Sequence, residues 1–132
     1  MSSCVFCDIV ADPSQAHVVL DDEVCIAFLD RTPLFHGDVL VVPRSHVVTL
    51  ADLATHDVGP FFERVQKIAR VMPAALGAQG TFVAANNTVS QSVAHLHVHV
   101  VPRTKGDGLK GFFWPRTKYE TEDVMREVAT TL

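Results

Sequence analysis

The 132-residue sequence has few cysteines and no long apolar run. Its three cysteines cannot all pair within one chain, which excludes a fully paired disulfide framework. No apolar stretch reaches the roughly 20 residues that a membrane-spanning helix needs. The first residues lack the basic and then apolar pattern of a secretory signal. We therefore expect a cytoplasmic protein that makes no contact with membranes.

An excess of positive charge is also missing. The chain carries 11 Lys and Arg against 15 Asp and Glu, and its formal net charge is −4. General nucleic-acid binders are usually basic, so we expect no nucleic-acid partner. A small anionic ligand is still compatible with this balance, because local charge decides its binding. The length and the apolar fraction of 48% predict one domain over residues 1–132.

The periodicity of the apolar residues predicts an α+β fold. Short connections between the predicted strands favour an antiparallel sheet of about five strands. One long helix is predicted over 56–72, where Pro73 is expected to end it, and short helices are predicted over 4–11 and from Thr121 onward. Because the long helix lies between strands, α+β is the favoured class. The predicted strands are 16–20, 24–29, 38–42, 81–85 and 95–101.

Three histidines alternate with apolar residues in the last predicted strand, where residues 95–99 read His-Leu-His-Val-His. Alternate side chains of a strand share a face, so the imidazoles are expected in one row, about 6.6 Å apart, on the face away from the core. Before this strand, the Ser-Gln-Ser stretch at 90–92 offers short polar side chains that suit a phosphate. The row predicts either a phosphate-handling site or three ligands of one metal ion.

These residues resemble the signature of the histidine-triad (HIT) family, His-φ-His-φ-His-φ-φ, in which φ is apolar. The segment 28–33 (Phe-Leu-Asp-Arg-Thr-Pro), Gly37 and the segment 39–43 also match, and the likeness extends from Cys4 to about Arg103. The resemblance implies a homodimer that binds nucleotides, here with a purine nucleotide as substrate. It further implies cleavage of phosphoanhydride or phosphoramidate bonds at the α-phosphorus.

The resemblance also implies a role for each residue of the site. His97 is similar to the family nucleophile, His99 to the histidine that contacts phosphate, and Ser92 to the leaving-group contact. Ser90 stands where many members have glycine. Other substrate contacts that the resemblance implies are Asp30 for the ribose, Gln91 and either Asn86 or Asn87 for phosphate, and Trp114 as an aromatic that reaches the partner's site.

The chemistry of imidazole fits the role of His97. A phosphorus atom that bears negative oxygens repels anionic nucleophiles, whereas a neutral imidazole with an ordinary pKa of about 6.5 avoids this repulsion. We expect His97 to attack the α-phosphorus in line and to form a nucleotidyl-histidine, which water or another acceptor resolves. A hydrogen bond from the other ring nitrogen to a backbone carbonyl would fix the required tautomer.

A metal site is predicted beside the histidine row. Cys4 and Cys7 form a Cys-x-x-Cys pair, whose sulfurs can reach one ion. Some HIT members bind structural zinc with such a pair, a histidine after the third strand and the first triad histidine. The resemblance therefore implies Zn²⁺ held by Cys4, Cys7, His46 and His95. Incidental thiols or a disulfide are the alternative interpretation of the two cysteines.

The C-terminal arm, about 103–132, begins with a basic and aromatic stretch that includes Trp114. Such a segment can attract polyphosphate and stack on a base. Two other functions compete with the nucleotide hydrolase: a metallohydrolase that uses His95, His97 and His99 as zinc ligands, and a nucleotide-binding regulatory protein with vestigial activity. The leaving group is not determined by the sequence, and an amine, a nucleotide, a sulfate and an acyl group are all candidates.

Overall fold

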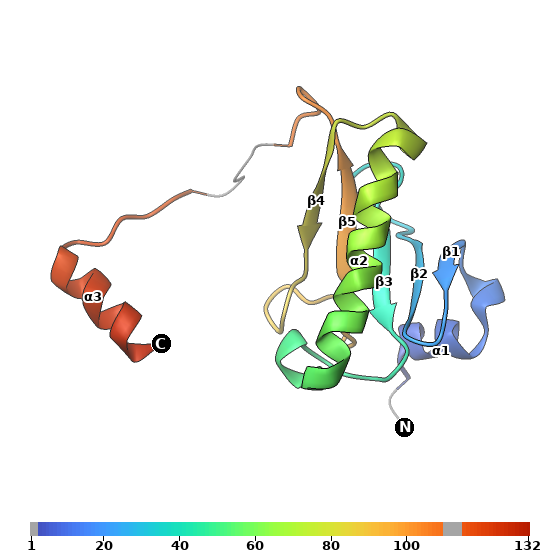
Figure 1. Cartoon of the computed structure of the whole chain (residues 1–132), viewed down its shortest axis with the longest axis horizontal. Helices are drawn as coiled ribbons and strands as arrows, with labels where there is room; N and C mark the ends of the chain where they lie inside the picture. The colour runs from blue at the N-terminus through green and yellow to red at the C-terminus, as the bar shows by residue number, and fades with distance from the viewer. Residues whose placement is uncertain (1–2, 110–114) are drawn as a thin grey trace.

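Residues 3–109 and 115–132 are described by the computed structural model shown in Figure 1. Within these residues, five strands form one antiparallel sheet in the order β1-β2-β3-β5-β4. The α+β architecture is therefore confirmed, with one long helix and a short helix near each end. The elements are α1 (Val5–Ala11), η1 (Pro13–Gln15), β1 (Val18–Asp21), β2 (Cys25–Leu29), β3 (Val39–Pro43), η2 (Leu50–Asp52), α2 (Thr55–Leu76), β4 (Gly80–Ala84), β5 (Val98–Arg103) and α3 (Glu122–Thr131).

The long helix α2 covers one face of the sheet (Figure 1). Its buried side chains repeat at helical spacing and interlock with alternate residues of β2, β3 and β5, as the periodicity predicted. Burial of this apolar surface is the main force that holds helix and sheet together. The helix contributes Phe61, Val65, Ile68 and Met72, and the strands contribute Cys25, Ala27, Val39, Val41, Val98 and Val100.

The opposite face of the sheet is covered in part by α1. Phe6 and Ile9 of this helix pack with the intervening residues of β2 and β3, which are Ile26, Phe28, Leu40 and Val42. Leu40 lies directly opposite His99 in the β3–β5 ladder, and directly opposed residues of an antiparallel pair share a face. The histidines at 97 and 99 therefore lie on the side of α1, while Val98 and Val100 face α2.

The helix α2 extends four residues beyond its predicted end. Pro73 lies inside its last turn, where the missing N–H removes one helical hydrogen bond but does not end the helix. The helix ends instead at Gly77, whose φ of 67° is left-handed and suits glycine. The N–H of Ala78 then donates to the carbonyl of Pro73 at 3.0 Å. The prediction that Pro73 closes the helix was wrong.

The strand β5 begins at Val98, not at His95 as predicted. It pairs with β3 only from Val98 to Val100, and the preceding residues turn toward another partner. The N–H of Leu96 donates to the carbonyl of Val47 at 2.8 Å. His95 and His97 thus lie on an extended segment before the ladder. Both are buried, with 0% and 4% of their surface exposed, so the predicted outward-facing row is also corrected.

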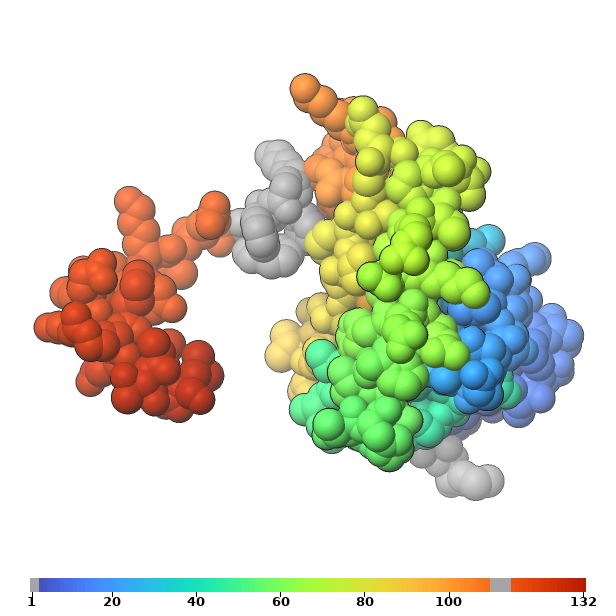
Figure 2. Space-filling view, in the orientation of Figure 1, coloured from blue at the N-terminus to red at the C-terminus, as the bar shows by residue number. Residues whose placement is uncertain are grey.

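The C-terminal helix α3 stands apart from the rest of the molecule (Figures 1 and 2). It begins after Thr121, as predicted, and the Thr121 side chain accepts the Val124 N–H. Every residue from 115 to 132 is exposed. None of the described helices has both the length and the apolar character needed to cross a bilayer.

Candidate functional site

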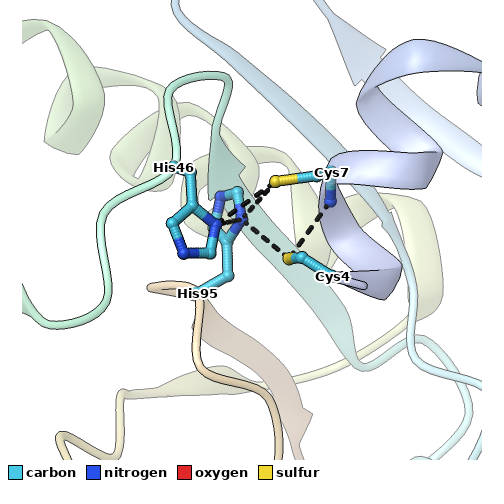
Figure 3. Close-up of side chains that lie close together, drawn as sticks. All are labelled: Cys4, Cys7, His46 and His95. Atoms are coloured by element: carbon cyan, nitrogen blue, oxygen red, sulfur yellow. Dashed lines mark hydrogen bonds between the residues drawn. The ribbon is translucent and has the colours of Figure 1, made fainter. Parts of the chain in front are cut away.

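Four potential metal ligands converge from three parts of the chain (Figure 3). Cys4 and Cys7 come from the start of α1, His46 follows β3, and His95 precedes β5. The Cys4 sulfur lies 3.4 Å from Nδ1 of His95, and the Cys7 sulfur lies 3.2 Å from Nδ1 of His46. The Cys7 sulfur is 3.5 Å from Nδ1 of His95, and the two Nδ1 atoms are 3.2 Å apart.

These separations fit the edges of a tetrahedron around zinc. Zinc bonds of about 2.3 Å to sulfur and about 2.0 Å to nitrogen give sulfur–nitrogen edges of about 3.5 Å and nitrogen–nitrogen edges of about 3.3 Å. Nε2 of His95 lies 2.9 Å from the carbonyl oxygen of Pro43, to which it donates. This bond leaves Nδ1 unprotonated toward the thiols, as a metal ligand requires. Two thiols and two imidazoles therefore form a group that could hold a metal ion.

The helix α1 is positioned by the cysteine pair. Cys4 is its N-cap, and the Cys4 sulfur accepts the Cys7 N–H at 3.4 Å. Between the two cysteines, Phe6 points into the molecule and packs edge-on against Phe28, His95 and His97. One short helix thus supplies both thiols and an aromatic contact to the triad.

His97 has one ring nitrogen committed to the backbone. Its Nδ1 lies 2.8 Å from the carbonyl oxygen of His95. A carbonyl only accepts, so Nδ1 carries the proton and Nε2 keeps its lone pair. Burial lowers the pKa of His97, against the opposing effect of this hydrogen bond. The result is a neutral imidazole with a nucleophilic nitrogen.

His99 faces two carboxylates. Its Nδ1 lies 3.2 Å from Oδ1 of Asp38 and 3.8 Å from Oδ2 of Asp30. The hydrogen bond to Asp38 raises the pKa of His99, and burial opposes this effect. His97 and His99 are neighbours, with ring centroids 5.4 Å apart. The two adjacent imidazoles therefore have pKa values moved in opposite directions.

A cleft of about 260 Å³ opens beside these two rings. One wall is apolar and comes from α1 and β2, and the other end is polar. Asp30 lies at this end, and its Oδ1 accepts the N–H of Thr32 at 3.0 Å. The cleft thus joins an apolar slot to a carboxylate and two imidazoles. The residues that line the cleft include Phe6, Ile9, Phe28, Asp30, Ser92, His97 and His99.

The cleft lining does not include the three predicted phosphate contacts, Gln91, Asn86 and Asn87. The Gln91 side chain donates to the carbonyl of Val48 at 2.6 Å and accepts the N–H of Thr88 at 2.8 Å. Asn87 accepts the N–H of Leu50 at 2.7 Å. These side chains hold the loop that precedes the histidine segment.

The same loop adopts an uncommon backbone conformation. Thr88 and Ser90 have φ values of 68° and 61°. A positive φ is energetically unfavourable for a residue that has a side chain, whereas glycine adopts it without this cost. Glycine would adopt the conformation of Ser90 without this strain. Asn86 supports the turn, because its side-chain amide donates to the Ser90 carbonyl at 3.2 Å.

Sequence reasoning missed Asp38 and Phe6. The apolar pattern makes Asp38 the first residue of a predicted strand, yet Asp38 is 1% exposed and its side chain pairs with His99. The sequence signal that could have identified Asp38 is a charged residue directly before the apolar run 39–42. A buried strand does not normally begin with a carboxylate. Phe6 gave no signal beyond its place between the two cysteines.

The three triad imidazoles do not converge on one point. Nδ1 of His95 faces the thiols, Nδ1 of His97 faces a carbonyl, and Nδ1 of His99 faces Asp38. Within the described residues, the groups of possible metal ligands include His95 and His99 separately and do not include His97. This geometry does not favour a single metal ion held by all three rings.

The start of the C-terminal arm is less basic than its composition suggests. The Arg103 guanidinium donates to both carboxylate oxygens of Asp107, at 2.6 and 3.1 Å, and to the carbonyl of Leu109. Arg103 is thus occupied in closing a turn. Trp114 lies outside the described residues.

Known proteins resemble this chain over most of its length. The family model described as the HIT domain matches residues 12–106. An uncharacterized HIT-like protein of Methanocaldococcus jannaschii is 33% identical over 95% of this chain and 98% of its own length. Adenylylsulfatase HINT3 of Arabidopsis thaliana is 31% identical over 82% of this chain and 56% of its own length. Adenosine 5'-monophosphoramidase of Schizosaccharomyces pombe is 27% identical, over 92% and 90%.

Solved structures also resemble this chain. A HIT-family protein from Bacillus subtilis superimposes with a TM-score of 0.85 at 31% identity, over 98% of this chain and 95% of that one. A zinc-bound histidine-triad protein from Mycobacterium smegmatis gives a TM-score of 0.76 at 32% identity, over 98% of each chain. The family model, the relatives and the histidine motif together show that this chain belongs to the HIT family.

Proposed function

We propose that the protein is a nucleotide hydrolase or nucleotidyl transferase that acts at the α-phosphorus through a covalent bond to His97. The observation that carries this proposal is the hydrogen bond from Nδ1 of His97 to the carbonyl of His95, at 2.8 Å. It leaves Nε2 with a lone pair on a residue that lines the cleft. The tautomer is the one that nucleophilic attack requires.

In the first step, Nε2 of His97 forms a bond to phosphorus as the bond from phosphorus to the leaving group breaks. The ring becomes a cation, and the His95 carbonyl keeps its contact with the Nδ1 proton. The leaving atom takes a proton from Ser92 or from solvent. In the second step, water attacks phosphorus and gives its proton to Ser92 or to solvent, whichever supplied the proton in the first step. The bond to Nε2 breaks, and the nucleoside monophosphate is released.

The cleft suits a nucleotide. The apolar wall formed by Phe6, Ile9 and Phe28 can hold a purine base, and the Asp30 carboxylate can accept hydrogen bonds from ribose hydroxyls. His99 and Ser92 then lie where phosphate oxygens and the leaving atom would be. Gln91, Asn86 and Asn87 would reach phosphate only if their present bonds within the loop exchanged. Trp114 is proposed to reach the partner's site from the arm.

The names of two relatives bear on the substrate class. The Schizosaccharomyces pombe relative is named as a phosphoramidase, and the Arabidopsis thaliana relative as an adenylylsulfatase. Both names support substrates in which an adenylyl group carries a leaving group on phosphorus. Nucleoside phosphoramidates and dinucleoside polyphosphates are the two substrates proposed for this chain.

We propose that Zn²⁺ is a structural cofactor, held by Cys4, Cys7, His46 and His95. A Cys₂His₂ set leaves no open coordination position, so the ion ties α1 to the histidine segment and takes no part in the chemistry. The tetrahedral spacing of the four ligand atoms and the zinc-bound Mycobacterium smegmatis structure support this proposal.

We also propose a homodimer in the cytoplasm. An isolated ten-residue helix is marginal in water, so α3 needs a surface to pack against. Its apolar side chains are exposed, and none of α3 is buried within the described chain. A second copy of the chain is the partner that the HIT family suggests.

A substrate panel combined with trapping tests the proposed function. The panel compares kcat/KM for an adenosine phosphoramidate and for diadenosine polyphosphates, and acid quenching with labelled substrate traps the nucleotidyl enzyme. The wild type should turn over at least one substrate and retain label, whereas His97→Ala should do neither and should bind nucleotide within about tenfold of the wild type. Comparable turnover in His97→Ala would refute the mechanism, and nucleotide binding without any label or turnover in the wild type would favour the regulatory alternative.

A further inference from the structure

Asp38 is a buried carboxylate at the edge of the site. It is 1% exposed and lies where the loop after β2 enters β3. Its main chain is fixed on both sides, because its N–H donates to the carbonyl of Phe35 at 3.0 Å and its carbonyl accepts the N–H of Asp30 at 2.9 Å. The position of the carboxylate is therefore determined by the backbone.

The two oxygens of Asp38 have different partners. Oδ2 accepts the N–H of Leu34 at 3.2 Å, and Oδ1 lies 3.2 Å from Nδ1 of His99. A buried ionised carboxylate is costly unless a donor or a cation compensates it. One backbone N–H satisfies one oxygen, so the imidazole of His99 is the group that compensates the other. None of the residues predicted from the sequence was assigned this role.

We propose that Asp38 is a positioning residue that fixes a proton on Nδ1 of His99 and holds this ring as a cation, so that Nε2–H donates to a phosphate oxygen of the substrate. This inference rests on the proposed function, because it assumes that His99 faces the phosphate. A neutral ring with its proton on Nδ1 would present a lone pair from Nε2 to the phosphate and would repel it. The charge on His99 therefore decides between binding and repulsion.

The surroundings of His99 support this charge. In the described part of the chain, the titratable groups that face the ring are Asp38, Asp30 and His97. The Asp38 hydrogen bond raises the pKa of His99, and the Asp30 carboxylate adds to this effect. A charged His97 ring would lower the pKa of His99, but burial disfavours the charged form of His97. Leu40 and Ala84, which lie opposite His99 on β3 and β4, are apolar.

Asp38→Asn tests the proposal without removing the side-chain volume. By ¹⁵N-detected NMR of the histidine rings, the wild type should show His99 protonated on Nδ1, with a titration midpoint above the ordinary value for histidine. In Asp38→Asn the midpoint should move to lower pH, and each unit of movement reduces the charged fraction about tenfold at alkaline pH. An unchanged His99 midpoint in Asp38→Asn would overturn the proposal, whatever the activity of the enzyme.

Kinetics give a second, independent measurement. For Asp38→Asn, kcat/KM at pH 8 should fall about tenfold or more, and it should approach the wild-type value near pH 6, where His99 regains its proton. Asp38→Glu should recover part of the loss at pH 8. A loss that is equal at every pH would indicate a purely structural role and would contradict the proposal.

Two further variants separate the possible outcomes. Asp107→Asn is the matched control, because it also removes a hydrogen-bonded carboxylate, which is 13% exposed, but lies away from the cleft. It should leave the His99 midpoint unchanged.

In a His99→Asn background, Asp38→Asn should have no further pH-dependent effect. If His97→Ala retained turnover, the proposed function would fail, whereas a normal His97→Ala result with an unmoved His99 midpoint would reject the role of Asp38 alone.

Discussion

The ring of Phe6 packs edge-on against the imidazole of His97, with their centroids 5.0 Å apart and their planes at 79°. Phe6 lies between Cys4 and Cys7 on α1, and it also lines the cleft. The group that could hold a metal and the wall of the cleft are therefore two sides of one short helix. Because seven residues form a helix that is unstable alone, the position of α1 depends on its contacts at both sides.

The first prediction concerns Cys7→Ser. This variant should lose most of the bound zinc, measured by elemental analysis against one ion per chain in the wild type. Loss of the ion should loosen α1, so the melting temperature should fall and KM for nucleotide should rise more than kcat falls. A wild-type protein that carried no zinc after expression in zinc-containing medium would contradict the metal assignment.

Cys25→Ala is the matched control for this experiment. Cys25 is buried in the core under α2, and burial raises the pKa of its thiol to about 12. Its replacement should cost about 1 kcal/mol through the lost packing and should leave the zinc content unchanged. Equal loss of zinc in both variants would mean that the metal responds to stability in general.

The second prediction concerns Asp30 and the sugar. If its carboxylate accepts ribose hydroxyls, the wild type should favour a ribonucleotide substrate over its 2'-deoxy form by about 1–2 kcal/mol in kcat/KM. Asp30→Ala should lower kcat/KM for the ribonucleotide and remove most of this preference. A preference that persisted unchanged in Asp30→Ala would show that the carboxylate does not contact the sugar hydroxyl.

The sequence predicted the sheet and the long helix well, for reasons that are local, whereas the metal-ligand group was predicted from the resemblance to the HIT family. The spacing of Phe61, Val65, Ile68 and Met72 specifies a buried helical face, and this face is observed. The β-branched run 38–42 specifies a buried strand. Such patterns act within one element, so one element's residues are enough to show them.

The errors arose where tertiary contacts override the local pattern. Residues 95–97 alternate like a strand, but the N–H of Leu96 finds its acceptor at Val47, so the ladder with β3 starts only at Val98. The hydrogen bond from the Gln91 amide to the Val48 carbonyl joins residues 43 positions apart, and the local sequence gives no sign of it. The pairing of Asp38 with His99 links residues 61 positions apart, which periodicity does not reveal.

The third prediction is a dependence of stability on pH. Contact with Asp38 raises the pKa of His99 above its unfolded value of about 6.5. The pair therefore stabilises the fold fully below about pH 6.5, and this contribution is lost as the pH rises through the raised folded value. The melting temperature of the wild type should exceed that of Asp38→Asn most near pH 6 and least near pH 9. Effects of the other histidines cancel in this difference, and a difference that grew with pH would contradict the prediction.

The fourth prediction concerns the loop that leads to Asp38. Gly37 has a φ of 102°, and a Cβ at this position would meet the side chain of Leu76 at the end of α2. Gly37→Ala should destabilise the protein by about 1–3 kcal/mol in denaturant unfolding, mainly through backbone strain. Gly59→Ala is the control, because a Cβ there meets open space on the first turns of α2. It should be neutral or stabilising by about 0.5–1 kcal/mol, and equal destabilisation by both changes would argue against strain at Gly37.

The fifth prediction concerns α3 and the proposed dimer. An apolar stripe on this helix is formed by Val124, Met125 and Val128 and continued by Leu132 at its end, and all four residues are exposed. If a second copy covers the stripe, the wild type should have about twice the monomer mass of 14.4 kDa by light scattering, and Val128→Asp should reduce this to one chain. Arg126→Ala, on the polar side of the helix, should leave the mass unchanged. A wild type that was monomeric at micromolar concentration would contradict the dimer, because α3 would then have no partner chain to bury its stripe.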